Sequence, residues 1–377
     1  GRTFLKGVRE LAPGSTLEFD FDSWNLTEGT SWKEYYLSTP FYKKENRGSH
    51  IKSNSENSFS ALKTNLFNTV EKRFLADVPV QIALSGGVDS TLLALIAKFK
   101  DKFFSRALTV SSSSRPSELK KSEFLCDSFS IEQSVIDFDA LDFLELLKES
   151  ILAQGGPLSH PHALAVYALT KEAAKQGKVL ITGEGADELM YGYEHHKNEN
   201  ATFAFIQHND PKEYFEINRS GLNEIDDIFS SDKIFENNDL RDLEVKTHLL
   251  SLLRRNDRIA MRNSLELRSA YLDFKLFETV TDLQEFGHLS RGKEFLARTI
   301  KMFFNQYEVD KEKIGFYIPF DEWYEKNKNL KKVQYFLKSS IEYCEKKLGL
   351  KLRPKTSIDG KLAWVLLNIG IFMDHYK

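Results

Sequence analysis

The segment with the clearest chemical potential is a short serine- and glycine-rich stretch, Ser85–Ser90, directly after the apolar run Val78–Leu84. Its two adjacent glycines let backbone N–H groups approach an anion without obstruction by a Cβ atom. A helix that begins here turns the positive end of its dipole toward the loop, which suits phosphate groups. The carboxylate of Asp89 is compatible with a phosphate only if a cation lies between them, so we expect Mg²⁺. The stretch therefore predicts a phosphate-binding loop, and the alternative is a tight strand-to-helix turn in which Asp89 or Ser90 caps the helix.

A second candidate segment, Thr182–Glu188, carries three carboxylates within five positions, those of Glu184, Asp187 and Glu188. It follows a predicted strand, and ligands bind at the carboxyl ends of strands in open α/β sheets. Carboxylates this close repel one another unless a cation or a proton intervenes, and both metal binding and general-base catalysis use such groups. Considered alone, a solvated acidic helix N-terminus explains the stretch equally well. Beside a phosphate-binding loop in the same sheet, a functional site becomes the better interpretation.

An arginine-rich stretch in the C-terminal half could bind an anionic substrate. Four arginines occupy the nine positions 254–262, and Glu266, Arg268 and Asp273 follow them. The same charges can form a buried ion-pair network that only positions elements, and we favour this interpretation for most of them. Lys313, next to a glycine-containing turn, is by default a charged surface residue.

Two further patterns carry less weight. Gly287–Lys293 is close to the nucleotide-binding P-loop, but Glu294 replaces the hydroxyl residue that would hold Mg²⁺ there. The histidine pairs His160 with His162 and His195–His196 have no cysteine or carboxylate at a metal-binding spacing. We therefore expect the histidines on the surface or in the core.

Strands that alternate with helices must position these segments. Apolar residues recur at helical spacing from Phe59 to Phe74, and more helical patterns follow. This alternation predicts βαβ units and an α/β fold with a mostly parallel sheet. Strand patterns fade after about Tyr191, so we expect a helical C-terminal part. The predicted strands are Val78–Leu84, Ala107–Val110, Gln133–Ile136 and Val179–Thr182.

The N-terminal stretch differs from the rest of the chain. Thr3–Val8 and Ser15–Asp22 alternate apolar and polar residues, and Leu11–Gly14 between them has the composition of a turn. A hairpin of this size is marginal alone, so we interpret it as the end of an upstream β-rich domain, followed by a polar linker. The predicted divisions are the domain remnant 1–42, the linker 43–58 and the α/β domain 59–377.

Composition excludes several classes of protein. The 377 residues include 52 Lys+Arg and 55 Asp+Glu, a net charge of −3, so no basic excess is available for general nucleic-acid binding. Cys126 and Cys344 are too few for a disulfide framework or a thiolate zinc site. No apolar run approaches the roughly 18 residues of a membrane span. We therefore expect a cytoplasmic protein with no nucleic-acid or membrane partner.

Taken together, these segments resemble a known family. Ser85–Ser90 resembles the pyrophosphate loop of the ATP-pyrophosphatase superfamily, whose core is an adenine-nucleotide α-hydrolase-like parallel sheet. With Thr182–Tyr193, the block Arg255–Asp273 and Lys313–Phe316 in the same order, the chain resembles the synthetase half of glutamine-dependent asparagine synthetases. The opening Arg2–Gly14 resembles the end of that family's N-terminal glutaminase domain.

The resemblance implies a reaction in which ATP adenylates a substrate carboxylate, pyrophosphate leaves, and ammonia or an amine displaces AMP. It implies Mg²⁺ on Asp89 and Asp187. Lys313 would stabilise charge during adenylation and Glu184 would help deprotonate the amine. Lys293 would support catalysis, and Glu184, Asp187, Arg255, Glu266 and Arg268 would face the substrate. The residues implied around ATP are Leu84, Ser85, Gly86, Gly87, Asp89, Ser90, Val110, Thr182 and Gly183.

The resemblance leaves the acceptor open. Residues 154–162 lack the acidic residue and the small polar patch usual in asparagine synthetases. An intramolecular cyclase of the β-lactam synthetase type and an amidotransferase for a sugar or natural-product carboxylate therefore remain alternatives. A glutaminase domain or subunit is the implied partner, and a homodimer is compatible with the family.

Two alternatives from other classes are less favoured. A pyrophosphatase that modifies tRNA usually needs a basic groove and catalytic cysteines, and the chain supplies neither. A binding or scaffold subunit descended from an enzyme would not need Asp89, Glu184, Asp187 and Lys313, which are all present.

Overall fold

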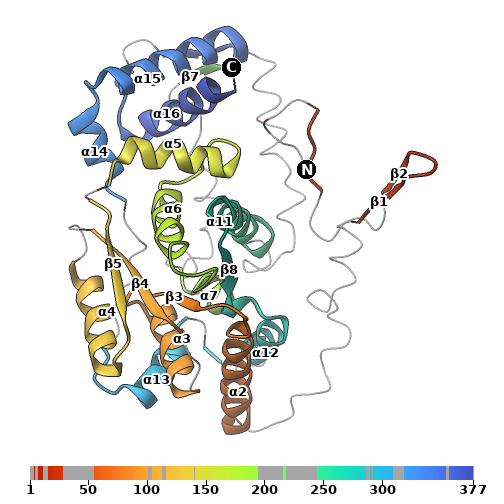
Figure 1. Cartoon of the computed structure of the whole chain (residues 1–377), viewed down its shortest axis with the longest axis vertical. Helices are drawn as coiled ribbons and strands as arrows, with labels where there is room; N and C mark the ends of the chain where they lie inside the picture. The colour runs from red at the N-terminus through yellow and green to blue at the C-terminus, as the bar shows by residue number, and fades with distance from the viewer. Residues whose placement is uncertain are drawn as a thin grey trace.

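The computed structural model describes most of the chain as an α/β domain with a helical group at its C-terminal end (Figure 1). The predicted linker overlaps the described part only from residue 55, and Lys313 and the pair His195–His196 lie outside it. The described residues are 4, 7–11, 16–28, 55–100, 104–112, 116–139, 141–193, 215–217, 244–285, 289–290, 292–308, 318–353 and 356–376.

A five-stranded sheet, parallel throughout, forms the centre of the domain, as the alternation of strands and helices predicts. The chain runs outward from the central strand through two neighbours on one side and then adds two strands on the other side. The order across the sheet is β5 (Gln133–Asp137), β4 (Arg106–Ser111), β3 (Val80–Ala83), β6 (Val179–Thr182) and β8 (Glu266–Ser269).

The strand order reverses between β3 and β6, and this point is where open α/β sheets bind their ligands. The register aligns Val80 with Val179, so the carboxyl ends of the two strands lie at the same edge. The loop after β3 and the turn after β6 are therefore neighbours. A Cβ atom placed on Gly183 would lie 3.1 Å from the Cβ of Asp89, which shows how closely the two connections approach.

Helices cover both faces because strand residues alternate between two cores. In β6, Val179 and Ile181 belong to one core and Leu180 to the other. On the first face, α3 packs against α13, and α2 packs against α12. The elements contributing to this first core are α2 (Ser55–Arg73), α3 (Val88–Phe99), α4 (Pro116–Phe129), α7 (Ala186–Met190), the 3₁₀ turn η6 (Ala270–Leu272), α12 (Phe274–Glu285) and α13 (Glu294–Phe303).

The second core extends from the other face of the sheet to the C-terminal helices. In Figure 1, α14, α15 and α16 form a group beyond α5, and α16 packs against both α15 and α5. The helical C-terminal part is thus confirmed. The helices are α5 (Phe143–Gln154), α6 (His162–Ala173), α11 (Leu250–Arg262), α14 (Phe320–Asn327), α15 (Lys331–Tyr343) and α16 (Gly360–His375), with the π-helical turn η7 (Cys344–Leu348). The π-helical turn η5 (Val245–Leu249) instead packs Val245 against the first core.

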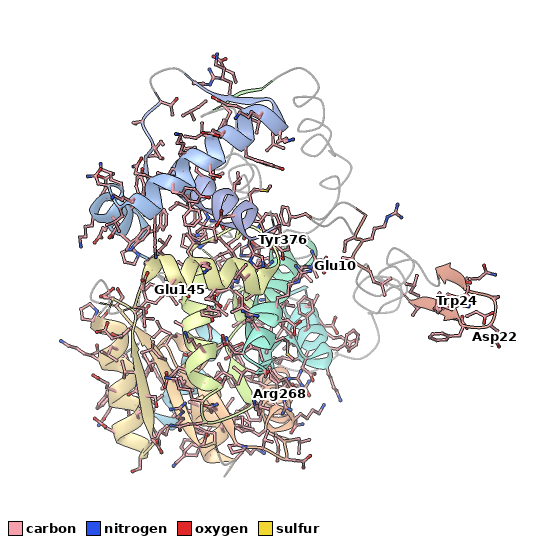
Figure 2. All side chains as sticks on the ribbon, turned by 45° about the horizontal axis from the view of Figure 1, so that its top comes forward. Glu10, Asp22, Trp24, Glu145, Arg268 and Tyr376 are labelled. Carbon is pink, nitrogen blue, oxygen red and sulfur yellow. The ribbon has the colours of Figure 1, made fainter. Side chains whose placement is uncertain are left out.

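The N-terminal hairpin forms, but not with the predicted pairing. β1 (Leu17–Asp20) pairs antiparallel with β2 (Asn25–Glu28) across a turn at 21–24. The Asp20 carboxylate fixes this turn by accepting a hydrogen bond from the N–H of Asp22 at 2.9 Å. Of the predicted partner strand Thr3–Val8, the structure describes Phe4, Gly7 and Val8, which do not lie in a strand; the rest of that prediction lies outside the described residues. Figure 2 shows the hairpin, with Asp22 and Trp24 labelled, standing away from the α/β domain.

Other differences concern strands that the sequence patterns did not indicate. The edge strand β8 lies within the arginine-rich block, and β7 (Phe215–Ile217) pairs antiparallel with β9 (Leu350–Leu352). The helix predicted from Phe59 begins earlier, at Ser55. Within the described residues, no helix combines the length and apolar character that crossing a bilayer requires.

Candidate active site at the carboxyl edge of the sheet

The loop after β3 has the geometry of an anion-binding turn. Gly86 has φ +79°, and a Cβ atom there would lie 2.6 Å from the carbonyl oxygen of Glu118, so only glycine fits. Gly87 is the N-cap of α3, and no side chain caps the helix. Ser90 Oγ instead accepts a hydrogen bond from the N–H of Ser85 at 3.1 Å, which folds the loop over the start of the helix. Neither Asp89 nor Ser90 caps α3, so the cap in the alternative interpretation is wrong, whereas the tight strand-to-helix turn of that interpretation is present.

Two tyrosines far away in the sequence hold this loop from behind. Tyr307 donates a hydrogen bond to the carbonyl oxygen of Gly86 at 2.8 Å, and Tyr271 donates one to that of Asp89 at 2.9 Å. Tyr271 is fully buried, and its burial raises its pKa well above the ordinary value, so the phenol stays a donor. Sequence reasoning assigned neither tyrosine to the site. The recognisable block Arg255–Asp273 included Tyr271, whereas no local pattern marks Tyr307.

Asp89 and Asp187 share one ammonium group, that of Lys293. Lys293 Nζ lies 2.5 Å from Asp89 Oδ2 and 2.6 Å from Asp187 Oδ1, and all three side chains are mostly buried. Burial acts to lower the pKa of Lys293, but the two carboxylates outweigh burial and raise that pKa above its ordinary value. The lysine is therefore charged at neutral pH. It is the cation that crowded carboxylates require, and it comes from the start of α13.

Two glycines near the Asp89–Asp187–Lys293 cluster stand at positions that have no room for a side chain. Gly192 lies against Asp187 and Lys293, and a Cβ atom there would collide with both. Gly185, at φ +90°, presses against the side chain of Leu272 and lets the chain turn sharply from β6 into α7. These close contacts place the acidic turn directly beside the loop Ser85–Ser90.

Glu184 lies opposite a buried arginine at the entrance to the turn. Arg255 Nη2 is 3.9 Å from Glu184 Oε1, and the guanidinium donates two hydrogen bonds to Asn256 Oδ1, at 3.0 and 2.9 Å. Burial lowers the pKa of Arg255, and the charge of Glu184 opposes this change. Glu184 retains about a quarter of its side-chain exposure, so a ligand can reach it while Arg255 fixes its position.

The third carboxylate of the acidic stretch is buried, not solvated. Glu188 is 2% exposed and accepts a hydrogen bond from the hydroxyl of Tyr193 at 2.7 Å. Burial raises the pKa of Glu188 to about 7, although the hydrogen bond from Tyr193 acts in the opposite direction. A solvated acidic helix N-terminus is therefore the wrong interpretation of this residue.

A histidine cluster borders the acidic turn on the side of α11. His160 is exposed at the surface, but partial desolvation lowers its pKa, and the charges of Arg255 and His248 lower it further. The His160 and His162 rings lie 4.1 Å apart, and Tyr193 meets His248 edge-on at 5.8 Å. Sequence reasoning placed His160 in the core or on the surface and missed its proximity to Arg255.

Glu266 and Arg268 lie away from the loop Ser85–Ser90. Glu266 begins β8 at the amino edge of the sheet, and Arg268 pairs with it at 2.8 Å. Arg268 also donates to the carbonyl oxygens of Arg73 and Leu75 at the end of α2. These contacts join the edge strand to a helix, as an ion-pair network would. Substrate binding by Glu266 and Arg268 stays a prediction, and their position at the amino edge of the sheet does not favour it.

The residues predicted around adenine lie near the loop, with different exposure. Leu84 is only 1% exposed, so its backbone, not its side chain, is available to a nucleotide. Val110 and Thr182 are partly buried near the carboxyl ends of β4 and β6, and Gly183 contacts Asp89.

The carboxylates at this edge fit Mg²⁺ only in combination with phosphate oxygens. Among the described residues, no group of three or more His, Cys, Asp or Glu side chains is arranged to hold a metal ion. Mg²⁺ commonly takes one or two carboxylates and completes its shell with substrate phosphates and water. Asp89 and Asp187, which already approach one cation together, match that pattern.

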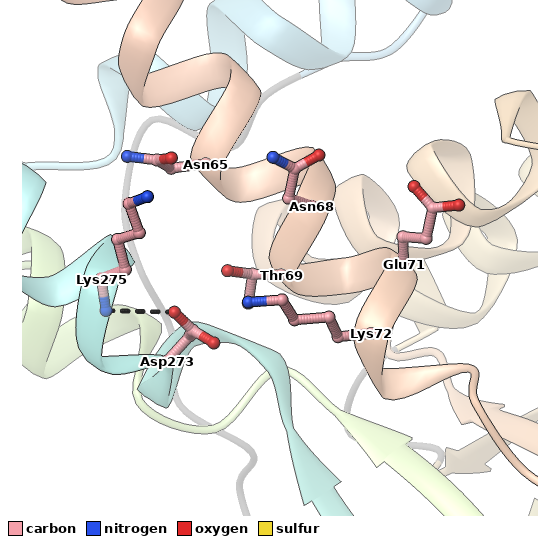
Figure 3. A pocket seen from close by; sticks show the side chains of 7 residues that line it. All are labelled: Asn65, Asn68, Thr69, Glu71, Lys72, Asp273 and Lys275. Carbon is pink, nitrogen blue, oxygen red and sulfur yellow. Dashed lines mark hydrogen bonds between the residues drawn. The ribbon is translucent and has the colours of Figure 1, made fainter.

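A polar cavity elsewhere on the domain does not belong to this site. It has a volume of about 250 Å³ and lies between α2 and the start of α12 (Figure 3). The N–H of Lys275 donates to Asp273 Oδ1 at 3.1 Å across its rim. None of its lining residues comes from the loop Ser85–Ser90 or the acidic turn; they are Asn65, Asn68, Thr69, Glu71, Lys72, Asp273 and Lys275.

Comparison with known proteins gives matches to the part of the chain that carries the candidate site. The family model for asparagine synthase matches residues 61–340. Glutamine-hydrolyzing asparagine synthetase 1 of Bacillus subtilis (strain 168) is 21% identical over 325 residues, which cover 70% of this chain and 50% of the relative. Amidase chyE of Penicillium rubens is 29% identical over 212 residues, which cover 51% of this chain and 30% of the relative.

The chain spans about half the length of the curated relatives it matches. Among solved structures, NMN synthetase from Francisella tularensis aligns with 71% of this chain and 100% of its own, at 14% identity. Its TM-score of 0.28 is too low to add to the fold described above.

Proposed function

The chain belongs to the asparagine synthase family, and from this premise we propose that it is an ATP-dependent amide-forming ligase that adenylates a carboxylate and then transfers ammonia or an amine to it. The observation that carries the proposal is the approach of Asp89 and Asp187 to one cation beside a glycine loop at the strand-order reversal. This arrangement suits a leaving pyrophosphate, which needs both N–H donors and charge neutralisation.

In the proposed reaction, ATP binds with its phosphates on the loop Ser85–Ser90. Ser85, Gly86, Gly87 and Ser90 offer N–H and hydroxyl donors. The adenine and ribose lie toward Leu84, Val110, Thr182 and Gly183. Asp89 and Asp187 would hold Mg²⁺, which neutralises the charge of the departing pyrophosphate when bound.

Lys293 has a positioning role in this proposal. Its ammonium keeps both carboxylates ionised and directed toward the same point, because an opposite charge within about 4–6 Å favours the charged form. Lys313 lies outside the described residues. From the family resemblance, we assign it the stabilisation of negative charge on the α-phosphate during adenylation.

The amine step is proposed to use Glu184. Its carboxylate retains access to solvent while Arg255 holds it from the buried side. A general base needs a fixed position within hydrogen-bond reach of the amine, and a contact with a buried guanidinium supplies that position. The nitrogen is proposed to come from a glutaminase domain or subunit, since relatives in this family are named as glutamine-hydrolyzing.

The acceptor is proposed to differ from aspartate. The electrostatic neighbours of Arg255 include His160, Glu184 and Tyr193. Residues 154–162, which carry His160, contain no Asp or Glu that could pair with a substrate ammonium. An intramolecular cyclase is the second candidate for the same reason. Product formation from a single substrate without ammonium or glutamine would distinguish it from an amidotransferase.

Exchange of [³²P]pyrophosphate into ATP in the presence of candidate acids tests the first half-reaction. We expect exchange with one acid class in the native chain and a loss of about 100-fold or more in Asp187→Asn. The matched control is Asp20→Asn, on the hairpin away from the site, which should exchange normally. Absence of exchange with every acid, or equal exchange in Asp187→Asn and the control, would count against the ligase.

A further inference from the structure

The N-terminal segment is anchored to α11 by one carboxylate. Glu10 Oε1 lies 3.1 Å from Arg254 Nε and 2.9 Å from Arg258 Nη2. About a quarter of the Glu10 side chain and a third of each arginine remain exposed, so the three groups are partly shielded from solvent. Figure 2 shows Glu10 beside α11.

An aromatic contact anchors the same segment at a second point. The ring of Phe4 meets that of Phe372 on α16 edge-on at 5.9 Å. Gly156 lies directly under the Phe4 ring, where a Cβ atom would have no room. The segment therefore touches the turn that follows α5 as well as two helices.

Arg258 connects the two anchor points. It bonds Glu10 through Nη2, and through Nη1 it donates to the carbonyl oxygen of Gln154 at 3.0 Å. Gln154 ends α5 and begins the stretch 154–162, which carries His160. The contacts of Glu10 thus reach α11 and the start of the stretch beside the histidine cluster.

The arginines of α11 have different partners along the helix. Arg254 and Arg258 are one turn apart and both reach Glu10, whereas Arg255 is buried and reaches Glu184. Like charges four residues apart destabilise a helix. A carboxylate shared between Arg254 and Arg258 removes that repulsion and holds this part of α11 in place.

We propose that residues 4 and 7–11 form an N-terminal clip, with Glu10 as a positioning residue that holds α11 and the 154–156 turn. Through α11 the clip sets the placement of Arg255 and hence of Glu184. Its consequence for the amine step rests on the function proposed above, whereas the clip itself does not.

Hydrogen exchange of the full chain, followed by mass spectrometry, tests the clip without any need for activity. In Glu10→Gln, we expect amides of 154–162 and of α11 to exchange about threefold or more faster than in the native chain. The control is Glu18→Gln, an exposed residue of β1, which should leave both segments unchanged. Raising the salt concentration should reduce the difference between Glu10→Gln and the native chain, because exposed ion pairs are screened. Equal exchange in Glu10→Gln and the control would overturn the proposal.

A double-mutant cycle and an activity measurement complete the test. If Glu10 acts through Arg258, the double variant of Glu10→Gln and Arg258→Gln should exchange no faster than the more affected single variant; fully additive effects would contradict the contact. In an enzyme active as proposed, Glu10→Gln should leave pyrophosphate exchange intact and raise the KM for the amine several-fold. An unchanged KM for the amine would overturn the coupling of the clip to Glu184. A native chain that shows no pyrophosphate exchange would refute the proposed ligase, but it would not affect the hydrogen-exchange test of the clip.

Discussion

At the scale of single residues, the central feature is a lysine placed where two carboxylates need a cation. Asp89 and Asp187 come from different strand ends, and Lys293 comes from the start of a helix more than a hundred residues later. The ammonium contacts both carboxylates and offsets the repulsion between their charges. The sequence predicted a cation beside these carboxylates and named it as Mg²⁺; in the structure the ammonium of Lys293 contacts both of them.

Replacing Lys293 with methionine tests this balance. Without the ammonium the two carboxylates repel, one of them takes up a proton, and the loop loses its fixed charge. We expect pyrophosphate exchange to fall by about 100-fold while the fold persists, as judged by circular dichroism. Lys301→Met, exposed on the same helix, is the matched control. If both variants exchange equally well, Lys293 has no part in the site.

A second residue-scale prediction concerns Glu188 and pH. Its folded-state pKa of about 7 exceeds the ordinary 4.5 because the carboxyl is buried. The folded protein therefore binds more protons than the unfolded chain between these values, and the stability from the neutral carboxyl is lost as the pH rises through 7. At about 1.4 kcal/mol per pKa unit, the loss of unfolding free energy is at most about 3.5 kcal/mol.

Urea unfolding at pH 5 and pH 8 measures this effect. Glu188→Gln should lose less stability between the two pH values than the native chain does, because an amide does not ionise. Glu278→Gln, exposed on α12, should show the native pH dependence. A pH dependence in Glu188→Gln as steep as the native one would show that another group is responsible.

Sequence reasoning found the site residues that carry local signatures and missed those that act from a distance. Asp89 and Asp187 lie in stretches whose composition is unusual by itself, so their proximity could be expected once a parallel sheet was predicted. Tyr307 contacts the loop only through the tertiary fold, and nothing in its neighbourhood marks it. The burial of Glu188 and the approach of His160 to Arg255 likewise depend on how helices pack.

At the scale of elements, a buried arginine ties the strands of the sheet together. Arg106 is 3% exposed and donates to Gln81 at 2.9 Å, to Ser134 at 2.7 Å and to the carbonyl oxygen of Glu172 at 3.2 Å. These contacts join β3, β4 and β5 to the end of α6. The guanidinium thereby satisfies polar groups that would otherwise be buried without a partner.

Arg106→Met should therefore destabilise the fold without touching the candidate site. We expect a loss of about 3 kcal/mol in the free energy of unfolding, because Gln81 and a helix carbonyl lose their donor in the interior. Arg298→Met, which removes an exposed i,i+4 pair with Glu294, should cost less than about 0.5 kcal/mol. Denaturant unfolding of both variants measures the difference, and equal midpoints would contradict the structural role of Arg106.

Strands could be predicted from the sequence where both faces of the strand are buried, because such a strand is a continuous run of apolar residues. The runs at Val78–Leu84 and Val179–Thr182 are of this kind, and the structure places β3 and β6 there. β8 was missed because this edge strand has only Leu267 as a large apolar residue, so its sequence has the composition of an ion-pair network. In the hairpin, apolar alternation indicated strand character but not the partner, which the turn at 21–24 decides.

At the scale of the whole molecule, the strand order determines where chemistry can occur. The reversal of strand order between β3 and β6 brings the loop Ser85–Ser90 and the acidic turn after β6 to the same edge of the sheet. Helices close the sheet on both faces, so the carboxyl edge is where a nucleotide can meet groups from several elements. The N-terminal clip and α11 then approach this edge from the side of Glu184.

The most direct measurement is a crystal structure of the chain with Mg²⁺ and α,β-methylene-ATP, which resists cleavage between the α- and β-phosphates. We expect the phosphates on the N–H groups of Ser85–Ser90 and the metal between Asp89 and Asp187. A nucleotide found in the cavity between α2 and α12, or bound with its phosphates away from the glycine loop, would contradict the proposed site.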